Sequence, residues 1–127
     1  MITRSRITAL ALTAACAAVP LTTFTASAAQ ASALATQSCN QLSNGTLCAT
    51  TDPAGYDAAY HKYSGATVTV RFHLECKNGT RVADHGSFAI AAGQRRSFTF
   101  SVGRQGECRV RLQDLTNATN YYTGYVS

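Results

Sequence analysis

The amino-acid sequence predicts an all-β domain: a small antiparallel β-sandwich or barrel of the Ig-like or Greek-key type, with two disulfides. Three observations support this fold class. Apolar and polar residues alternate with a period of two through most of residues 38–127, no segment carries a helical apolar stripe of useful length, and turn residues separate the alternating segments. About seven short strands arranged in this way are typical of a sandwich or barrel.

Residues 1–28 have the features of a secretory signal peptide. Two arginines precede an uncharged apolar run over residues 7–19, which is shorter than the roughly 20 residues that a helix needs to cross a bilayer. Small residues before Ala29 suit signal peptidase, and later small residues allow a cut as late as Thr36. Lipidation of Cys16 is the alternative.

We therefore expect a secreted, extracellular product without stable membrane insertion, made of a flexible N-terminus over 29–37 and a single domain over 38–127. Loss of the signal removes two arginines and lowers the formal net charge from +5 to +3. Four cysteines remain, an even number in an exported chain, which indicates two disulfides. A metal site is the rival interpretation. The sequence has no Cys-x-x-Cys pair and its histidines are scattered, so we expect neither a metal nor another cofactor.

The first predicted element is a hairpin over Cys39–Cys48. A four-residue loop over 42–45, with Gly45 at positive φ, would set Cys39 opposite Cys48, where the two can form a disulfide. A strand follows over 56–60, in which Tyr56, Ala58 and Tyr60 alternate with polar or small residues.

The clearest predicted strand is Ala66–Cys76. Its apolar residues face one way and end on Cys76, while Arg71, His73 and Glu75 face the other way, so one face is core and one is wet. The remaining elements, in order, are a turn at 77–80, a weaker strand over 81–90 broken near 84–86, a turn at 91–94, a strand over 95–102, a turn at 103–106, a strand over 107–112, a turn at 116–120 and a closing strand over 121–126.

The second disulfide is expected between Cys76 and Cys108, which lie three strands apart. In a flat meander those strands would be separated by about three spacings of ~4.8 Å, too far for a bridge whose Cα atoms must lie within ~7 Å. Either the sheet folds over or the strand order is Greek-key, and the two cysteines then meet across the core. The two other pairings of the four cysteines remain open.

Two resemblances rest on these residues. The Ala-rich signal, the stretch Ser38–Cys48 and the strand pattern after it resemble uncharacterised small secreted proteins of actinomycetes; the likeness covers most of the mature chain and implies no activity. At the level of fold, the segments 66–76 and 91–100 resemble the tendamistat family of α-amylase inhibitors, which are small secreted β-sandwiches with two sequential disulfides. That family inserts a Trp-Arg-Tyr element into the amylase cleft, whereas this chain has no Trp, so the resemblance implies a fold and a binding role but no site residues.

The sequence shows no catalytic constellation, and we predict that the protein is not an enzyme. Asp57 and His61 would lie about 13 Å apart along a strand. His73 and Glu75 lie on an outward face. The stretch Asp84–Ser87 contains the residue types of a Ser-His-Asp triad, but residues adjacent in a chain seldom converge as one, so we interpret it as a turn or bulge.

Three arginines on outward strand faces are the first candidate binding residues: Arg71, Arg109 and Arg111. Arg109 and Arg111 are two residues apart, which sets their side chains side by side at about 6–7 Å. Charged residues on strand faces usually serve solvation and edge protection. The functional alternative is an acidic partner, such as teichoic acid or an acidic protein.

Tyrosines are the second candidate set, because a tyrosine offers rigid contact area with a polar tip. They cluster in two segments, and about half must belong to the core. Basic and aromatic residues do not interleave, which argues against nucleic acid as a partner. The candidates are Tyr56, Tyr60, Tyr121 and Tyr125.

These features predict a secreted binding or interaction module whose partner is a protein or a cell-wall polymer or glycan. Hydrolase inhibition is the first specific hypothesis. The alternative is a cell-envelope-associated or structural extracellular protein.

Overall fold

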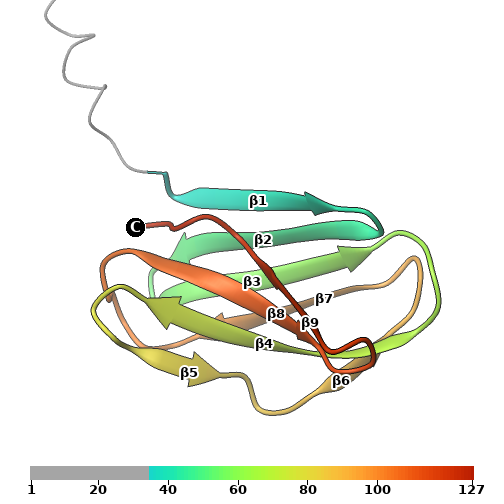
Figure 1. The fold of residues 1–127 in the computed structure, drawn as a ribbon. Helices are drawn as coiled ribbons and strands as arrows, with labels where there is room; N and C mark the ends of the chain where they lie inside the picture. Colours follow the sequence, from blue (N-terminus) through green and yellow to red (C-terminus); the bar gives the residue numbers. More distant parts are fainter. Residues whose placement is uncertain (1–34) are drawn as a thin grey trace, which may run out of the picture. The chain divides into compact units, whose positions relative to one another are not determined.

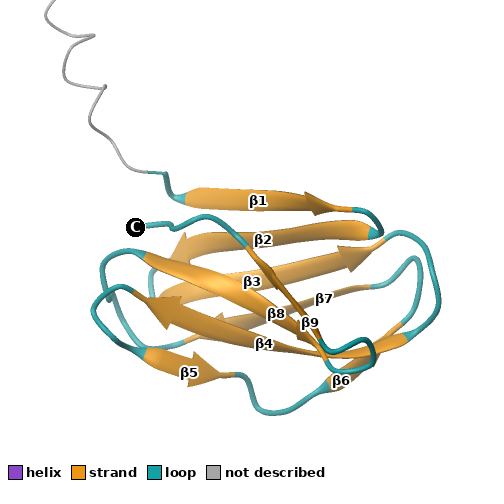
Figure 2. Cartoon of the chain, viewed as in Figure 1, coloured by secondary structure: helices purple, strands orange, loops and turns teal. Residues whose placement is uncertain are grey.

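Two antiparallel β-sheets face each other in the computed structural model, which describes residues 35–127 (Figure 1). No helix occurs among these residues (Figure 2), and the predicted all-β sandwich with two disulfides is confirmed. The strands are β1 (Gln37–Leu42), β2 (Gly45–Asp52), β3 (Gly55–Lys62), β4 (Val68–Cys76), β5 (Arg81–Ala83), β6 (Phe88–Ile90), β7 (Arg95–Phe100), β8 (Cys108–Asp114) and β9 (Thr119–Tyr122).

The strand order explains how a short chain closes two layers. The first sheet has the order β1-β2-β3-β7, and the second sheet has the order β5-β4-β8-β9, with β6 also paired to β4. After β6 the chain leaves the second sheet to add β7 beside β3, and it then returns to add β8 beside β4. The order is therefore not that of a flat meander, as the sequence required.

The core lies between the two sheets and is built by the period-two alternation of their strands. On β4 and β8, alternate residues are buried, and the residues between them are half-buried except for Glu75, which is buried. Burying one such aliphatic or aromatic side chain contributes about 1.5–3 kcal/mol. The largest apolar contributions come from Leu47, Tyr56, Val70, Phe72, Leu74, Ile90, Val110, Leu112 and Val126.

The Cys76–Cys108 disulfide joins neighbouring strands of one sheet. Cys76 lies directly opposite Cys108 in the β4–β8 ladder, and both residues are buried. The pairing was predicted correctly, but the expectation that the cysteines meet across the core was wrong, because β8 inserts next to β4. The Cys39–Cys48 disulfide joins β1 to β2 at directly opposed positions, as predicted.

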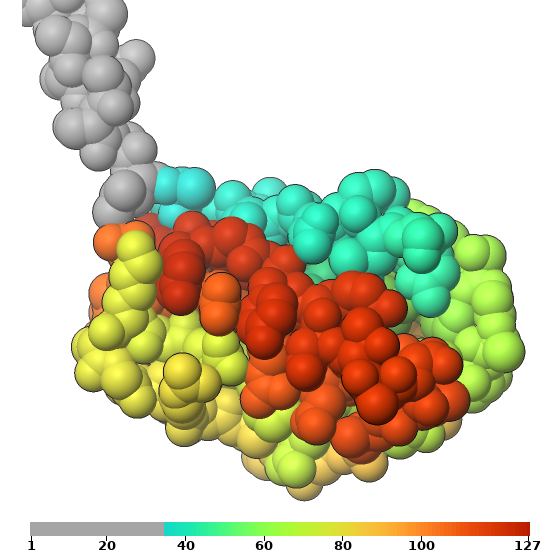
Figure 3. Space-filling model, viewed as in Figure 1, coloured from blue at the N-terminus to red at the C-terminus, as the bar shows by residue number. Residues whose placement is uncertain are grey.

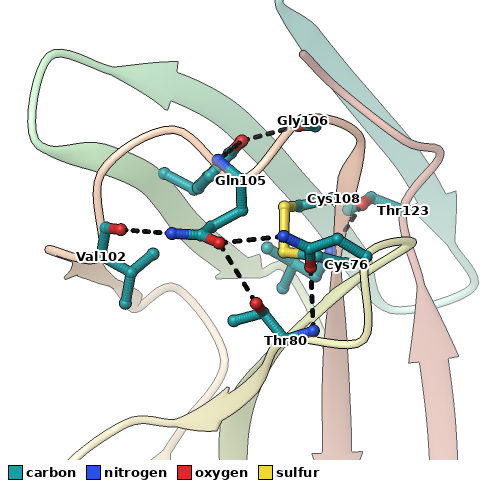
Figure 4. The surroundings of a disulfide bond; sticks show 10 residues. Cys76, Thr80, Val102, Gln105, Gly106, Cys108 and Thr123 are labelled. Atoms are coloured by element: carbon teal, nitrogen blue, oxygen red, sulfur yellow. Dashed lines mark hydrogen bonds between the residues drawn. A yellow bond between two sulfur atoms is a disulfide. The ribbon is translucent and has the colours of Figure 1, made fainter.

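A network of hydrogen bonds anchors the loop between β7 and β8 beside the buried disulfide (Figure 4). The Gln105 side chain donates to the Val102 carbonyl at 2.6 Å and accepts from the Thr80 hydroxyl at 3.2 Å. The Tyr56 hydroxyl, on the other sheet, donates to the Gly106 carbonyl at 2.6 Å and accepts from the main-chain N–H of Gln105 at 2.9 Å. Tyr56 thereby satisfies its polar tip inside the domain.

Two predicted local features differ in the structure. The closing strand β9 runs over Thr119–Tyr122 instead of 121–126, and beyond it only Val126 forms a bridge, with Cys108. Gly45 is the first residue of β2 and does not have positive φ. Glycine is required there because a Cβ would lie 2.3 Å from the His61 carbonyl oxygen of the neighbouring strand.

The expected signal peptide over 1–28, its cleavage site before Ala29 and the lipidation alternative at Cys16 lie outside the described residues. Most of the expected flexible segment 29–37 lies outside them too. β1 begins at Gln37, next to the predicted domain start at residue 38.

Candidate functional site

Two of the three predicted arginines, Arg109 and Arg111, lie together on the outer face of the second sheet. Glu75 on β4 lies opposite Arg109 on β8 and opposite Arg81 on β5, while Arg111 lies opposite His73. Because successive residues of a strand point to opposite faces, these side chains share the outward face. Figure 3 views the domain from this side, where the C-terminal residues, in red, lie in front.

Three guanidinium groups converge on the carboxylate of Glu75. Arg111 Nε lies 2.9 Å from Oε2, Arg81 Nη1 lies 3.1 Å from the same oxygen, and Arg109 Nη2 lies 3.1 Å from Oε1. The Glu75 side chain is only 10% exposed, although it points outward, because the arginines cover it. We call Glu75, Arg81, Arg109 and Arg111 the arginine cluster; it carries one negative and three positive charges.

The carboxylate of Glu75 stays ionised in this setting. Burial alone would raise its pKa, but hydrogen bonds from Arg111 and Arg109, together with the charges of Arg111 and Arg81, outweigh burial and lower the pKa. The cluster therefore keeps an excess of two positive charges at neutral pH.

Two exposed tyrosines border the arginine cluster. The guanidinium carbon of Arg109 lies 4.2 Å from the ring centroid of Tyr122 and 5.3 Å from that of Tyr125, within cation–π range. Lys77 Nζ lies 4.6 Å from the Tyr125 centroid. Arg111 also donates to the Asn120 side chain at 2.9 Å. Arg109 and Arg111 are therefore held in fixed positions.

The structure corrects three of the four predicted tyrosines. Tyr56 and Tyr60 are buried on the inner face of β3, and Tyr121 packs against the core, so none of them offers an exposed platform. Burial raises the pKa of Tyr60, with smaller contributions from Tyr121 and Asp114. Tyr125 does lie on the outer face, where Tyr122 joins it. In the β8–β9 ladder Tyr121 lies opposite the inward Leu112 and Tyr122 lies opposite the outward Arg111. Because β9 ends at Tyr122, the alternation does not continue to Tyr125, and Tyr121 and Tyr125 do not share a face.

Arg71 lies apart from the cluster, in a structural role. Its Nε lies 3.0 Å from Oδ1 of Asp84, a carboxylate that is almost fully buried. The other carboxylate oxygen of Asp84 accepts the main-chain N–H of Phe72 at 2.9 Å, and thus replaces a missing strand partner between β5 and β6. The break predicted near residues 84–86 is therefore a bulge whose ladder is completed by a side chain.

The titratable residues considered for catalysis do not converge. Asp57 accepts a hydrogen bond from Thr99, and His73 pairs with Gln113 instead of Glu75. His85 packs edge-on against Phe98, while the Asp84 carboxylate points to Phe72 and Arg71.

Within residues 35–127, no group of three His, Cys, Asp or Glu side chains is placed to hold a metal ion. The same part of the chain has no helix that is long and apolar enough to cross a membrane.

Comparison with protein-family models, with curated proteins and with solved structures finds no match to this chain. Arginines with fixed forked geometry bind carboxylate, phosphate and sulfate oxygens, and tyrosine rings beside them pack against the flat faces of sugars or side chains.

Proposed function

We propose that the protein is a secreted binding module that uses the outer face of its second sheet to bind an anionic extracellular polymer, such as an acidic cell-wall polymer. The observation that carries this proposal is the convergence of three arginines on one carboxylate. One negative charge cannot neutralise three positive charges, so the cluster attracts further anions.

The fixed positions of Arg109 and Arg111 favour binding. A free arginine loses much conformational freedom when it binds an anion, up to about 2 kcal/mol for a fully ordered side chain. In this protein Glu75, Asn120 and Tyr122 already restrict the two arginines. Arg81 is 72% exposed and has its second guanidinium edge available to a ligand.

A polymer suits this face better than an enzyme cleft does. The cluster lies on the face of a sheet instead of on a projecting loop, and a hydrolase inhibitor needs an element that enters the cleft of its target. The earlier hypothesis of hydrolase inhibition thus has less support than the envelope alternative.

An extracellular setting fits the two disulfides, because such bonds persist in oxidising compartments. The sequence features of residues 1–28 support export on independent grounds.

Retention on dextran sulfate beads, with uncharged dextran beads for comparison, tests the proposal. The wild-type protein should bind dextran sulfate at low salt and be released by added salt. Arg109→Ser/Arg111→Ser should weaken retention about tenfold or more, since each charged hydrogen bond contributes about 1.5–3 kcal/mol.

The matched control is Arg95→Ser/Arg96→Ser, which removes the same charge from β7 on the first sheet. Equal losses for the two double variants would show that only net charge matters and would reject the site. Because Glu75 depends on Arg109 and Arg111 for its partners, thermal unfolding must show that the double variant is folded. Arg81→Ser, at an exposed position, tests the same site without disturbing the other two ion pairs.

A further inference from the structure

The two long edges of the sandwich differ in how they are closed. Along the β1 edge, main-chain and side-chain hydrogen bonds join the sheets: Ser127 N donates to Ala35 O at 3.0 Å, Gly124 N to Ser38 Oγ at 2.9 Å, and Asn40 Nδ2 to Tyr122 O at 2.9 Å. Along the opposite edge, side chains of β7 in the first sheet meet those of β6 and of the β5–β6 connection in the second sheet, at Arg96–Phe88 and Phe98–His85. No ladder joins β7 to β5 or β6. We call this second edge the open seam.

The open seam is hollowed along β7. Two adjoining cavities of about 330 and 360 Å³ share His85 and Phe98 in their walls. The first continues over Phe72 and Phe88 to Arg96, and the second continues to Phe100. Among the described residues, six hydrophobic side chains are only partly buried against the core, and four of these line the seam: Val82, Phe88, Phe98 and Val102.

The edge of β7 offers main-chain groups for pairing. Lys62 N donates to Gln94 O, so these two residues form a hydrogen-bonded pair at the end of the β3–β7 ladder. In an antiparallel ladder every second pair is hydrogen-bonded, which makes Ala58 and Phe98 another such pair. Phe98 therefore bonds to β3, while the N–H and C=O groups of Ser97 and Thr99 point away from β3, toward the seam. In the described chain, only β3 pairs with β7.

The charge of the seam is positive. Arg95 and Arg96 are exposed at one end of β7, and the guanidinium carbon of Arg96 lies 4.5 Å from the ring centroid of Phe88. The acid in the wall of the first cavity, Asp84, is buried and already paired with Arg71. A second copy of this chain would bring its own Arg95 and Arg96 to the same edge, so charge favours a different, acidic occupant.

We propose that the open seam binds an extended peptide segment of another protein, which adds as a strand to the free edge of β7. The segment carries an acidic residue that pairs with Arg96 and apolar side chains on one face that fill the two cavities. Main-chain bonds to Ser97 and Thr99 would supply affinity, and the cavities would supply specificity. This site is separate from the arginine cluster and does not depend on the function proposed for it.

Selection from a library of linear twelve-residue peptides displayed on phage tests this inference, with the purified, oxidised protein as target. Enriched peptides should contain Asp or Glu together with apolar residues at alternate positions. Ser97→Pro, which removes an outward N–H from the edge, should abolish binding of these peptides. Ser97→Ala, which keeps that N–H, should retain it, and Arg109→Ser/Arg111→Ser should have no effect.

Arg96→Glu provides a second test that does not alter the main chain. It should weaken the acidic peptides at least tenfold and shift a repeated selection toward basic ones. The inference is overturned if no peptide is enriched, if enriched peptides bind the Ser97→Pro protein as well as the wild type, or if the Arg96→Glu selection keeps the acidic pattern. The inference would also be overturned if the wild-type protein associates with itself and the Ser97→Pro variant does not. In that case a second copy of the chain, and not a peptide of another protein, would occupy the seam.

Discussion

Glu75 is the residue on which the arginine cluster depends. Its carboxylate has two oxygens, and both accept hydrogen bonds from guanidinium groups of neighbouring strands. Without it, three positive charges would lie close together with no acid between them, and like charges on facing strands are destabilising. One carboxylate therefore both stabilises the sheet and fixes the geometry of the proposed site.

Glu75→Gln should lower the free energy of unfolding by about 1–3 kcal/mol at pH 7, because it replaces charge-assisted hydrogen bonds with neutral ones. The folded state lowers the pKa of Glu75, so the stabilisation is complete above the unfolded-state value of about 4.3 and is lost as pH falls through the lower folded-state pKa. Urea unfolding of the wild type and of Glu75→Gln, at pH 7 and at pH 3, measures the difference in their free energies of unfolding. The difference between wild type and variant should shrink at pH 3, and an equal difference at both values would contradict the assignment.

At the scale of the elements, the strands were predictable where alternation is regular. Residues 66–76 alternate without interruption, and β4 occupies Val68–Cys76. The end of the chain was less predictable, since Thr119 and Asn120 look like turn residues yet pair with Asp114 and Gln113. The placement of β8 beside β4 depends on contacts between distant segments, which local pattern does not encode.

Substitution of Gly45, the first residue of β2, tests whether the close approach of β2 to β3 requires a glycine. Gly45→Ala should destabilise the protein by about 1–3 kcal/mol, because the added methyl group meets main-chain atoms of His61 on β3 that cannot move freely. Gly86→Ala is the matched control, since a Cβ there meets nothing within 4 Å, and its effect should stay within about 0.5 kcal/mol. Thermal unfolding of both variants is the measurement, and equal effects would contradict the close approach.

The two disulfides should contribute unequally to stability. Loop entropy assigns about 2.6 kcal/mol to Cys39–Cys48, whose cysteines are separated by 9 residues, and about 3.7 kcal/mol to Cys76–Cys108, separated by 32. Replacing the buried Cys76 and Cys108 with alanine also leaves a cavity, whereas Cys39 is exposed. The Cys76→Ala/Cys108→Ala variant should therefore melt at a lower temperature than Cys39→Ala/Cys48→Ala. The reverse order would contradict both the loop-entropy estimate and the cavity argument.

At the scale of the whole molecule, the sandwich presents two separate surfaces: the arginine cluster on one sheet face and the open seam along one edge. Arg109 and Arg111 were predicted from their two-residue spacing. Glu75, which joins them, was seen in the sequence only as a solvated neighbour of His73, because the register that sets it opposite Arg109 is a property of the folded sheet. The burial of Tyr56 and Tyr60 likewise follows from which face of β3 meets the second sheet.

The central claim, that the arginine cluster binds an anionic polymer, is tested most directly by nitrogen-15 NMR of arginine Nε–H groups during titration with polyphosphate. The Nε–H resonances of Arg109 and Arg111 should shift most and saturate, while those of Arg95, Arg96 and Arg104, outside the arginine cluster, should shift less. Largest shifts at Arg95, Arg96 or Arg104, or no saturable shift at Arg109 and Arg111, would contradict the claim.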